Sequence, residues 1–368
     1  MPTEKKPLKI AVIGCGINGI SCAISLAERG HKIDIYEKKT AFSETSAKSS
    51  KLLHGGLRYL ENGHFKLVKE SLKERSNWVK KLPDLTKIQR FYMPIYKGHS
   101  RNKFLLFTGV KLYELLAANF SLGKSNMHSK KETLEANPLL KQEGLIGSVS
   151  YVDVQMDDYK IAEWLKNEAL NKGVDLKENN EVVSFCENGS LTTRGSETLN
   201  YDFIVNAAGP WAKELLKTNN IQSNFNMSLV RGSHLILDLK IQSPLVLQST
   251  KDKRIVFMLP LDNGCLLGTT EYSHNIKDPI VCTQIERDYL VDIANTYLEK
   301  TLTHKNIISD YAGVRPLVFD SNTMDVSKIN RDSAIELNES LINIFGGKWT
   351  SGPSLGEKVS DMIESSFR

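Results

Sequence analysis

A GxGxxG motif at residues 14–19 constrains the fold of this chain more than any other feature. The motif follows an apolar, β-branched run over 8–13 and precedes a helical pattern over 20–30. Residues 32–37 then alternate like a second strand, which ends at Glu37. A strand, a glycine turn, a helix and a second strand within about thirty residues are typical of the βαβ unit that binds a dinucleotide.

The glycines and the acid indicate which dinucleotides fit. Gly14, Gly16 and Gly19 allow the backbone to approach a pyrophosphate at the positive end of the helix. Glu37 stands eighteen residues beyond Gly19, where its carboxylate can accept hydrogen bonds from a ribose diol. An acid at this place disfavours a 2′-phosphate. FAD and NAD therefore remain open, and NADP is disfavoured.

The rest of the chain combines helical and strand patterns in an order that predicts two domains. Helices are expected over 67–82 and 161–172, and a β-rich stretch over 229–270 contains a hairpin turn at 262–264. We therefore predict an α/β fold, α+β overall, with an antiparallel β-sheet substrate domain inserted into a Rossmann-like domain. The predicted dinucleotide-binding domain comprises 1–80, 140–220 and 305–368, and the substrate or cap domain comprises 81–139 and 221–304.

Composition places the chain among folded, soluble proteins. Its 368 residues are 40% apolar and 25% charged, which disfavours disorder, a collagen-like fibre and a small disulfide scaffold. No apolar run approaches the ~20 residues of a membrane-spanning helix. The N-terminus leads into a strand, so we expect no signal peptide. Five cysteines without CxxC spacing indicate a reduced, cytoplasmic protein with no thiol-bound metal.

The positive charge is concentrated in one segment. Residues 64–131 contain fifteen Lys or Arg against four Asp or Glu, although the net charge of the whole chain is only +5. Such a segment suggests an anionic partner, which can be nucleic acid, an anionic membrane surface or a phosphorylated substrate. A solvated helical surface without a partner is the alternative.

Residues 49–61 read SSKLLHGGLRYLE and resemble the flavin-binding segment of FAD-dependent glycerol-3-phosphate dehydrogenases, within the D-amino-acid-oxidase-like flavoproteins. The resemblance continues in order over most of 8–360. The further matching blocks are Tyr151–Asp153 with Asp157–Asp158, Val205–Trp211, Arg231–His234, Arg254–Phe257, Gly268–Thr270, Gly313–Leu317, Asn330–Asp332 and Phe345–Lys348.

The resemblance implies non-covalent FAD, held in a Rossmann-like FAD-binding domain. It also implies oxidation of sn-glycerol 3-phosphate to dihydroxyacetone phosphate, with hydride passing to flavin N5 and electrons passing on to quinone. The cofactor contacts that it implies are Gly14, Gly16, Asn18, Gly19, Glu37, Lys38, Ser49, Ser50, Lys51, Leu52, His54, Gly55, Val182, Ala208, Gly209, Trp211, Gly346, Gly347 and Thr350.

Oxidation of a phosphorylated secondary alcohol needs three kinds of group. It needs a proton acceptor, cations for the phosphate dianion, and positive charge at the flavin N1–O2 edge. The resemblance favours His234 as the proton acceptor, with His54 as the alternative, and places Lys348 near the flavin edge or the substrate. The catalytic set is then His234, Arg315 and Lys348, and the substrate-binding set is Arg58, Tyr59, Thr270 and Arg331.

Two departures from the family concern the end of the chain. After Lys348 the family commonly has Leu-Thr-Thr-Tyr-Arg, whereas residues 349–353 here read Trp-Thr-Ser-Gly-Pro. A tyrosine and an arginine are therefore missing near the flavin, although Thr350 can still offer its hydroxyl. The family also usually carries an additional C-terminal helical domain, which we expect to be absent because the sequence ends at Arg368.

The basic segment fits a membrane-facing role in this family. Residues 91–122 mix lysines and arginine with phenylalanines and leucines, as in an interfacial helix on an anionic leaflet. We therefore expect a cytoplasmic protein that binds peripherally to the inner face of the membrane. Nucleic acid is not expected, because no recognition fold accompanies the charge.

Two other functions remain open from the sequence. One is a related flavin oxidase or dehydrogenase of another polyol phosphate, a 2-hydroxy acid or an amine. The other is a flavin-binding module without turnover. The oligomeric state stays open.

Overall fold

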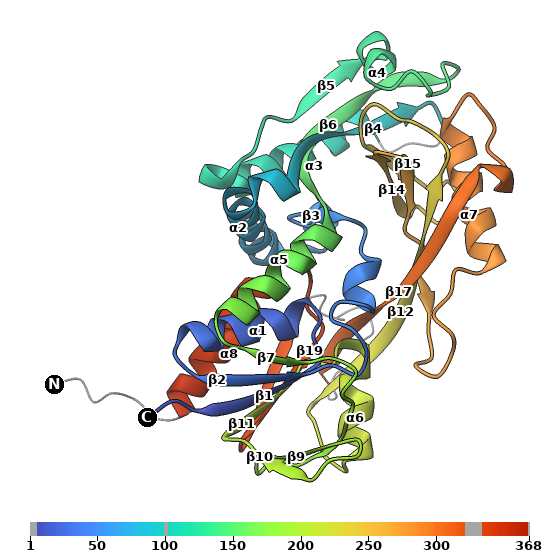
Figure 1. Cartoon of the computed structure of the whole chain (residues 1–368). Coiled ribbons are helices and arrows are strands. Elements are labelled where there is room, and N and C mark those ends of the chain that lie inside the picture. The colour runs from blue at the N-terminus through green and yellow to red at the C-terminus, as the bar shows by residue number, and fades with distance from the viewer. Residues whose placement is uncertain (1–5, 99–101, 321–332, 367–368) are drawn as a thin grey trace.

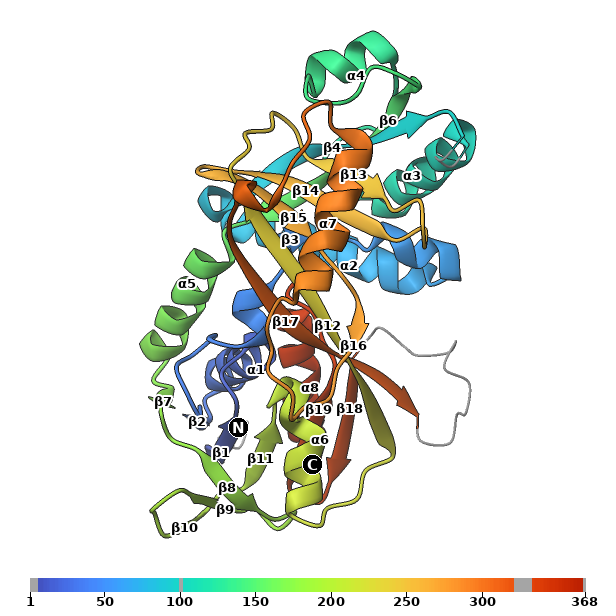
Figure 2. The ribbon, with the colours of Figure 1, turned by 90° about the vertical axis from the view of Figure 1, so that its right-hand side faces the viewer.

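The computed structural model describes residues 6–98, 102–320 and 333–366, without the side chains at 58, 61, 62 and 320. Figure 1 shows two lobes, each built on its own sheet. The long strands β12 (Phe225–Leu237) and β17 (Ile307–Asp320) run from one lobe into the other, as Figure 2 shows from the side. No helix of the described residues is long and apolar enough to cross a membrane.

The smaller lobe is built on a six-stranded sheet. Its neighbouring strands are parallel except at one edge, where β18 (Ala334–Asn338) pairs with β19 (Leu341–Phe345) in the antiparallel direction. The strand order is β18, β19, β11 (Phe203–Asn206), β1 (Lys9–Ile13), β2 (Lys32–Tyr36) and β7 (Asp175–Lys177). The register of the central strands sets Val12 opposite both Val205 and Ile35.

Both faces of this smaller sheet are covered, because successive side chains of β1 alternate between two apolar layers. Ile10 and Val12 pack with apolar residues of three helices, whereas Ala11 and Ile13 pack on the opposite side. The first layer contains α1 (Ile17–Glu28), α5 (Asp158–Asn171) and α8 (Gly352–Ser366). The second contains α6 (Ala212–Thr218) and a three-stranded sheet of β8 (Val182–Phe185), β9 (Ser190–Thr193) and β10 (Thr198–Asn200).

The larger lobe is built on a mixed, mostly antiparallel sheet. Its order is β16 (Tyr272–Ser273), β12, β15 (Gly264–Gly268), β14 (Ile255–Leu261), β13 (Leu245–Gln248), β4 (Thr86–Tyr96), β6 (Leu145–Met156) and β3 (Leu52–Leu53), with β17 paired to β12 and β5 (Asn126–Ser129) paired to β6. Its helices are α2 (Phe65–Lys81), α3 (Lys103–Ala117), α4 (Lys130–Ala136) and α7 (Gln284–Tyr297).

Within the part of the chain that the structure describes, six short 3-10 helices complete the connections between these elements. They are η1 (Thr45–Lys48), η2 (Leu57–Asn62), η3 (Pro83–Leu85), η4 (Ala118–Phe120), η5 (Gly209–Trp211) and η6 (His304–Asn306).

The predicted fold class is confirmed, with a parallel core and an antiparallel sheet built from intervening segments. The strands and helix around the GxGxxG motif form as expected, and the turn at 262–264 joins β14 to β15. The domain boundaries stay a prediction. Strands β6 and β17 lie in segments assigned to the dinucleotide-binding domain, yet both pair within the larger sheet.

A buried ion pair anchors α2 to the larger sheet. Arg75 on α2 is only 1% exposed and donates to the Asp153 carboxylate (3.1 Å) and to Val152 O (3.2 Å) on β6. The other carboxylate oxygen accepts from the Tyr113 hydroxyl of α3 (2.9 Å), and that hydroxyl in turn accepts from Gly55 N (2.7 Å). Two helices and the segment after β3 therefore depend on one buried carboxylate.

Removing the cation of this pair should destabilise the protein strongly. An Arg75→Met variant leaves Asp153 buried without its positive partner, so the free energy of unfolding should fall by about 3–5 kcal/mol. Urea unfolding measures it, with Lys131→Met as the control because the Lys131 side chain is 87% exposed. Equal stability of the two variants would contradict the role given to the Arg75–Asp153 pair.

Candidate active site

A cavity of about 640 Å³ lies where the two lobes meet. It is bounded by the start of α1, by η1 and β3, by α3, and by β12, β17 and the turn after β19. Among its lining residues are Ser49, Ser50, Leu52, His54, Tyr59, His234, Arg315, Gly347, Lys348 and Thr350, all of which the sequence predicts for cofactor, substrate or catalysis. Segments far apart along the chain thus meet at one hollow.

The glycine turn forms a close backbone contact between β1 and α1. A Cβ atom at Gly19 would lie 1.9 Å from Gly14 O, and one at Gly14, whose φ is +95°, would lie 2.8 Å from Ala207 O. Only glycine satisfies both conditions. The turn thus has the tight backbone geometry that lets a pyrophosphate approach the positive end of α1.

The acidic residue after β2 lies beside this turn. The Glu37 carboxylate accepts hydrogen bonds from Cys15 N (2.8 Å) and Lys39 N (2.9 Å). Lys38, also predicted for the cofactor, is exposed and pairs with Glu181 (2.7 Å). Glu37 is thus brought to the glycine turn, whereas the Lys38 side chain points to the surface.

Of the other residues predicted to bind the cofactor, Asn18 links two turns of the site, and five lie outside the lining of the cavity. Asn18 on α1 donates to Gly346 O (2.9 Å), which joins the glycine turn to the turn after β19. Val182, Ala208, Gly209, Trp211 and Gly16 do not line the 640 Å³ cavity; Ala208 lies close to Gly14, and Val182 is buried at the start of β8.

Lys51 and Ser49 are held by one carboxylate next to the cavity. The Lys51 ammonium forms an ion pair with Asp158, and the Ser49 hydroxyl donates to the other oxygen of the same group (2.7 Å). The backbone at Lys51 has a φ of +54°. This arrangement fixes the turn that precedes β3.

The histidine-glycine segment after β3 is held from two sides. His54 N donates to Thr350 Oγ1 (3.2 Å), and Gly55 N donates to the Tyr113 hydroxyl. Burial lowers the pKa of His54, with the cations Lys348, Arg75 and Arg315 acting in the same direction against Asp153. His54 is therefore uncharged at neutral pH, and its segment presents backbone to the cavity.

The tryptophan that departs from the family pattern has a clear structural place. Trp349 stacks on Phe42 (5.7 Å between ring centroids) and donates to Ser46 O (2.9 Å). The Ser46 hydroxyl in turn accepts from Ile17 N at the start of α1 (3.0 Å). Trp349 thus stabilises the contact between η1 and the first turn of α1.

Two of the predicted cations share the cavity. Arg315 on β17 donates to Thr269 Oγ1 (2.7 Å). The Lys348 ammonium lies 4.3 Å from the centre of the Tyr59 ring, and its nitrogen is buried with no hydrogen-bond partner among the described residues. Arg331 and the side chain of Arg58 lie outside the described residues. The cavity therefore holds at least two positive groups that can meet an anion.

His234 is buried on β12 and contacts Ser50, between η1 and β3, and Tyr311 on β17. One ring nitrogen, Nε2, lies 2.8 Å from the Ser50 hydroxyl, and the ring stacks on Tyr311 (4.8 Å between centroids). Burial lowers the pKa of His234 to about 3, and the nearby charges of Arg315 and Lys51 act in the same direction. The imidazole is therefore neutral at physiological pH.

Thr270 is not brought to the cavity. Its hydroxyl donates to the Glu286 carboxylate (2.7 Å) and accepts from Ser233 N (2.8 Å), and its side chain is fully buried. The neighbouring Thr269 lines the cavity instead. Lys48, which the sequence analysis did not single out, also lines it, with its ammonium 5.9 Å from the Tyr311 ring centre.

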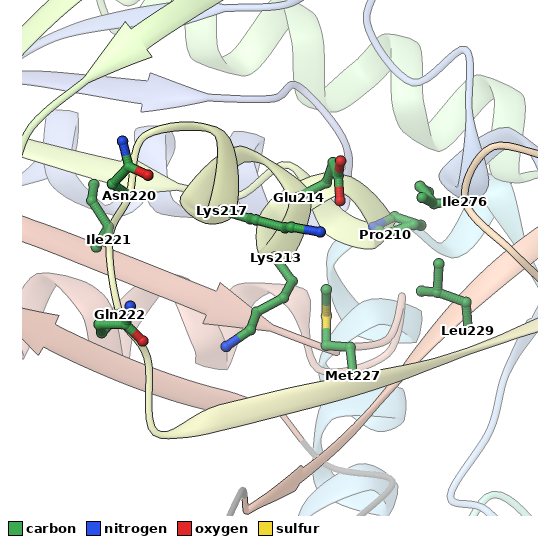
Figure 3. A pocket seen from close by; sticks show the side chains of 10 residues that line it. All are labelled: Pro210, Lys213, Glu214, Lys217, Asn220, Ile221, Gln222, Met227, Leu229 and Ile276. Carbon is green, nitrogen blue, oxygen red and sulfur yellow. The ribbon is translucent and has the colours of Figure 1, made fainter.

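A second hollow lies between α6 and β12 (Figure 3). Its volume is about 390 Å³, and its lining mixes lysines with apolar side chains such as Met227 and Leu229. Lys213 donates to Phe225 O (2.7 Å). This hollow contains none of the residues predicted for catalysis or substrate binding.

The donor set of the main site fits a flavin dinucleotide. The glycine turn offers backbone to a pyrophosphate, and Glu37 lies beside it for a ribose. The Lys348 ammonium and Asn18 Oδ1 are both buried without hydrogen-bond partners among the described residues, as expected of groups that bind a ligand. Fold and site together define a dinucleotide-binding oxidoreductase with a substrate sheet over the cofactor domain.

Comparison with known proteins agrees with this class. The profile of the FAD dependent oxidoreductase family, DAO, matches residues 9–362. The aerobic glycerol-3-phosphate dehydrogenase of Staphylococcus haemolyticus is 31% identical over 98% of this chain and 67% of its own length. The chain therefore belongs to the DAO family of FAD-dependent oxidoreductases, and the prediction of FAD as its cofactor is confirmed.

Solved structures show the same fold. The FAD complex of glycerol-3-phosphate dehydrogenase from Bacillus halodurans has a TM-score of 0.77 at 25% identity, over 99% of this chain and 65% of its own. L-α-glycerophosphate oxidase from Mycoplasma pneumoniae has a TM-score of 0.78 at 18% identity, over 98% and 95%. The chain thus spans about two thirds of the length of the dehydrogenases that it matches.

Stability should depend on pH through His234. Its pKa is lowered by folding, so its contribution to stability is complete above the unfolded pKa, ~6.5, and is lost as the pH falls below that value. When the pH falls from about 6.5 to 5, the free energy of unfolding should decrease by about 1.5 kcal/mol more in wild type than in a His234→Gln variant. Urea unfolding at both pH values measures this difference. His304→Gln, which removes a more exposed histidine, is the control; identical losses in wild type and His234→Gln would contradict a neutral His234.

Proposed function

We propose that the chain oxidises sn-glycerol 3-phosphate to dihydroxyacetone phosphate. The observation that carries this proposal is the buried ammonium of Lys348, which has no hydrogen-bond partner among the described residues and shares a cavity with Arg315 and His234. The named relatives support it, since those with the highest identity are glycerol-3-phosphate dehydrogenases. FAD, when bound, accepts the hydride from the carbinol carbon.

The residues of the chain have separate roles in this proposal. Arg315 offers a planar fork of donors to the phosphate dianion, and Lys348 offers a point charge to the phosphate or the flavin edge. His234 takes the hydroxyl proton on one ring nitrogen. The phosphate dianion helps this step, because its negative charge opposes the effect of Arg315 and Lys51 on the His234 pKa.

Anaerobic reduction of the flavin tests the substrate. We expect the yellow colour of the holoprotein to bleach with sn-glycerol 3-phosphate and to persist with glycerol, glycine, L-proline and lactate. An Arg315→Ala variant should keep FAD but need about tenfold to a hundredfold more substrate for half-maximal reduction, because it loses charge-assisted hydrogen bonds. Arg29→Ala, which removes a cation between α1 and α8, is the control. Bleaching by an amino acid or lactate alone would point to another oxidase of the family.

We further propose that α3 contacts an anionic membrane and that the electrons pass to quinone there. Phe104, Leu105 and Leu115 on α3 are 72%, 65% and 73% exposed. Leu105 also lines the cavity, together with Leu106, Gly109 and Leu112 of the same helix. A large exposed apolar group on a helix that also bounds the site suits an apolar electron acceptor.

Vesicle binding tests this surface. The holoprotein should co-sediment with vesicles that contain phosphatidylglycerol and less with pure phosphatidylcholine, because the segment around α3 is basic. Replacing Phe104, Leu105 and Leu115 together by serine should weaken binding at least tenfold, since each exposed apolar group would lose its burial in the bilayer. Ile285→Ser on α7, where the side chain is 70% exposed, is the control. Equal binding of the triple variant and wild type would exclude α3 as the contact.

A further inference from the structure

The carboxylate of Glu286 on α7 is fully buried and accepts five hydrogen bonds. Oε1 accepts from the hydroxyls of Thr270 (2.7 Å) and Ser233 (2.8 Å). Oε2 accepts from the Arg231 guanidinium (2.9 Å) and from the backbone and hydroxyl of Thr283 (3.0 and 2.8 Å). Glu286 does not line the cavity, yet it joins α7 to the strands that do.

The contacts of Glu286 lead to Arg315 in two short steps. Thr270, held by Glu286, follows Thr269, whose hydroxyl accepts from Arg315 Nη2 (2.7 Å). The same nitrogen lies 3.5 Å from Thr270 O. A Cβ atom at Gly232 would lie 2.3 Å from this nitrogen, so the guanidinium has little room to move on that side. The position of Arg315 therefore depends on where residues 269 and 270 are held.

A second branch reaches the proposed proton acceptor. Ser233, which donates to Glu286, directly precedes His234 on β12, and Ser233 N donates to Thr270 Oγ1 (2.8 Å). Strand β12 also pairs with β15 at this point, with His234 opposite Gly268. The carboxylate thus holds the backbone of β12 next to His234 and the backbone at residue 270, whose carbonyl lies near Arg315.

The charge of Glu286 matters because all of its partners are donors. Burial alone would raise its pKa, but hydrogen bonds from Thr270, Thr283 and Ser233 outweigh burial and lower it. An amide at this position presents two N–H groups to donors that need an acceptor. The substitution Glu286→Gln therefore keeps the volume and disturbs the orientation of Thr270.

We propose that Glu286 is a positioning residue that sets Arg315 for the substrate phosphate through Thr270 and Thr269. This inference rests on the proposed function, in which Arg315 binds the phosphate. It assigns to a residue outside the cavity an indirect influence on substrate affinity. Glu286 itself touches neither substrate nor cofactor.

Flavin reduction of the holoprotein tests the inference. Glu286→Gln and Thr270→Val should each raise the sn-glycerol 3-phosphate concentration for half-maximal reduction about tenfold, with the limiting rate within about threefold of wild type. Thr270→Ser, which restores the hydroxyl, should return to within about threefold of wild type. In an Arg315→Ala background, Glu286→Gln should add less than about twofold, because the two act as one unit.

A matched control separates positioning from stability. Glu336 on β18 is a comparable buried carboxylate away from the cavity: it is 6% exposed and accepts hydrogen bonds from Asn224 in the smaller lobe. Glu336→Gln should leave the half-saturating concentration unchanged. If Glu286→Gln changes only the temperature of unfolding, or if its effect stays tenfold in the Arg315→Ala background, the positioning role is overturned.

Binding of inorganic phosphate distinguishes this inference from the proposed function. Its dissociation constant is read from the visible spectrum of the bound flavin and needs no turnover. If the wild-type holoprotein binds phosphate but its flavin is not reduced by sn-glycerol 3-phosphate, the proposed function is wrong. The positioning role still stands in that case if Glu286→Gln weakens phosphate binding about tenfold and Glu336→Gln does not. Unchanged phosphate binding in Glu286→Gln overturns it.

Discussion

The antiparallel pairing of β12 with β17 is the interaction on which the rest of this structure depends. The two strands pair from Phe225 to Leu237, and they extend from the smaller lobe into the larger one (Figure 2). A ladder of this kind fixes register along its length, so a one-residue slip would turn every side chain to the other face. The ladder sets His234 opposite Tyr311 and Val230 opposite Arg315. The relation of the lobes and the position of the cavity cation thus follow from one set of backbone bonds.

Much of the cofactor domain could be predicted from the sequence, because its signals are local. The GxGxxG turn, the strands beside it and the acid at Glu37 lie within about thirty residues, and each has a direct physical meaning. The prediction of FAD depended on the resemblance of residues 49–61 and the later blocks to a known family, because neither the glycines nor Glu37 distinguish FAD from NAD. The structure brings His234, Arg315 and Lys348 to one cavity, although nothing local in the sequence joins them.

Other features could not be predicted, because they depend on register and side-chain direction. Thr269 and Thr270 are adjacent, and only the strand geometry decides that Thr269 lines the cavity while Thr270 turns to α7. Glu286 lies on an ordinary helix whose pattern shows a capping box and nothing more. Strands β6 and β17 follow the pattern of buried strands in either sheet, so sequence periodicity does not decide which sheet they join.

The strand order of the smaller sheet also has a consequence for synthesis. Strand β11 lies between β1 and β19, and α8 packs on α1, so the centre of this sheet needs residues up to about position 345. At about 5–20 residues per second, a ribosome needs roughly seven to thirty seconds to pass from the end of β11 to the start of β19. During that time β11 has an open edge that can pair with other chains. The nascent chain therefore exposes an unpaired strand edge well before its cofactor domain is complete.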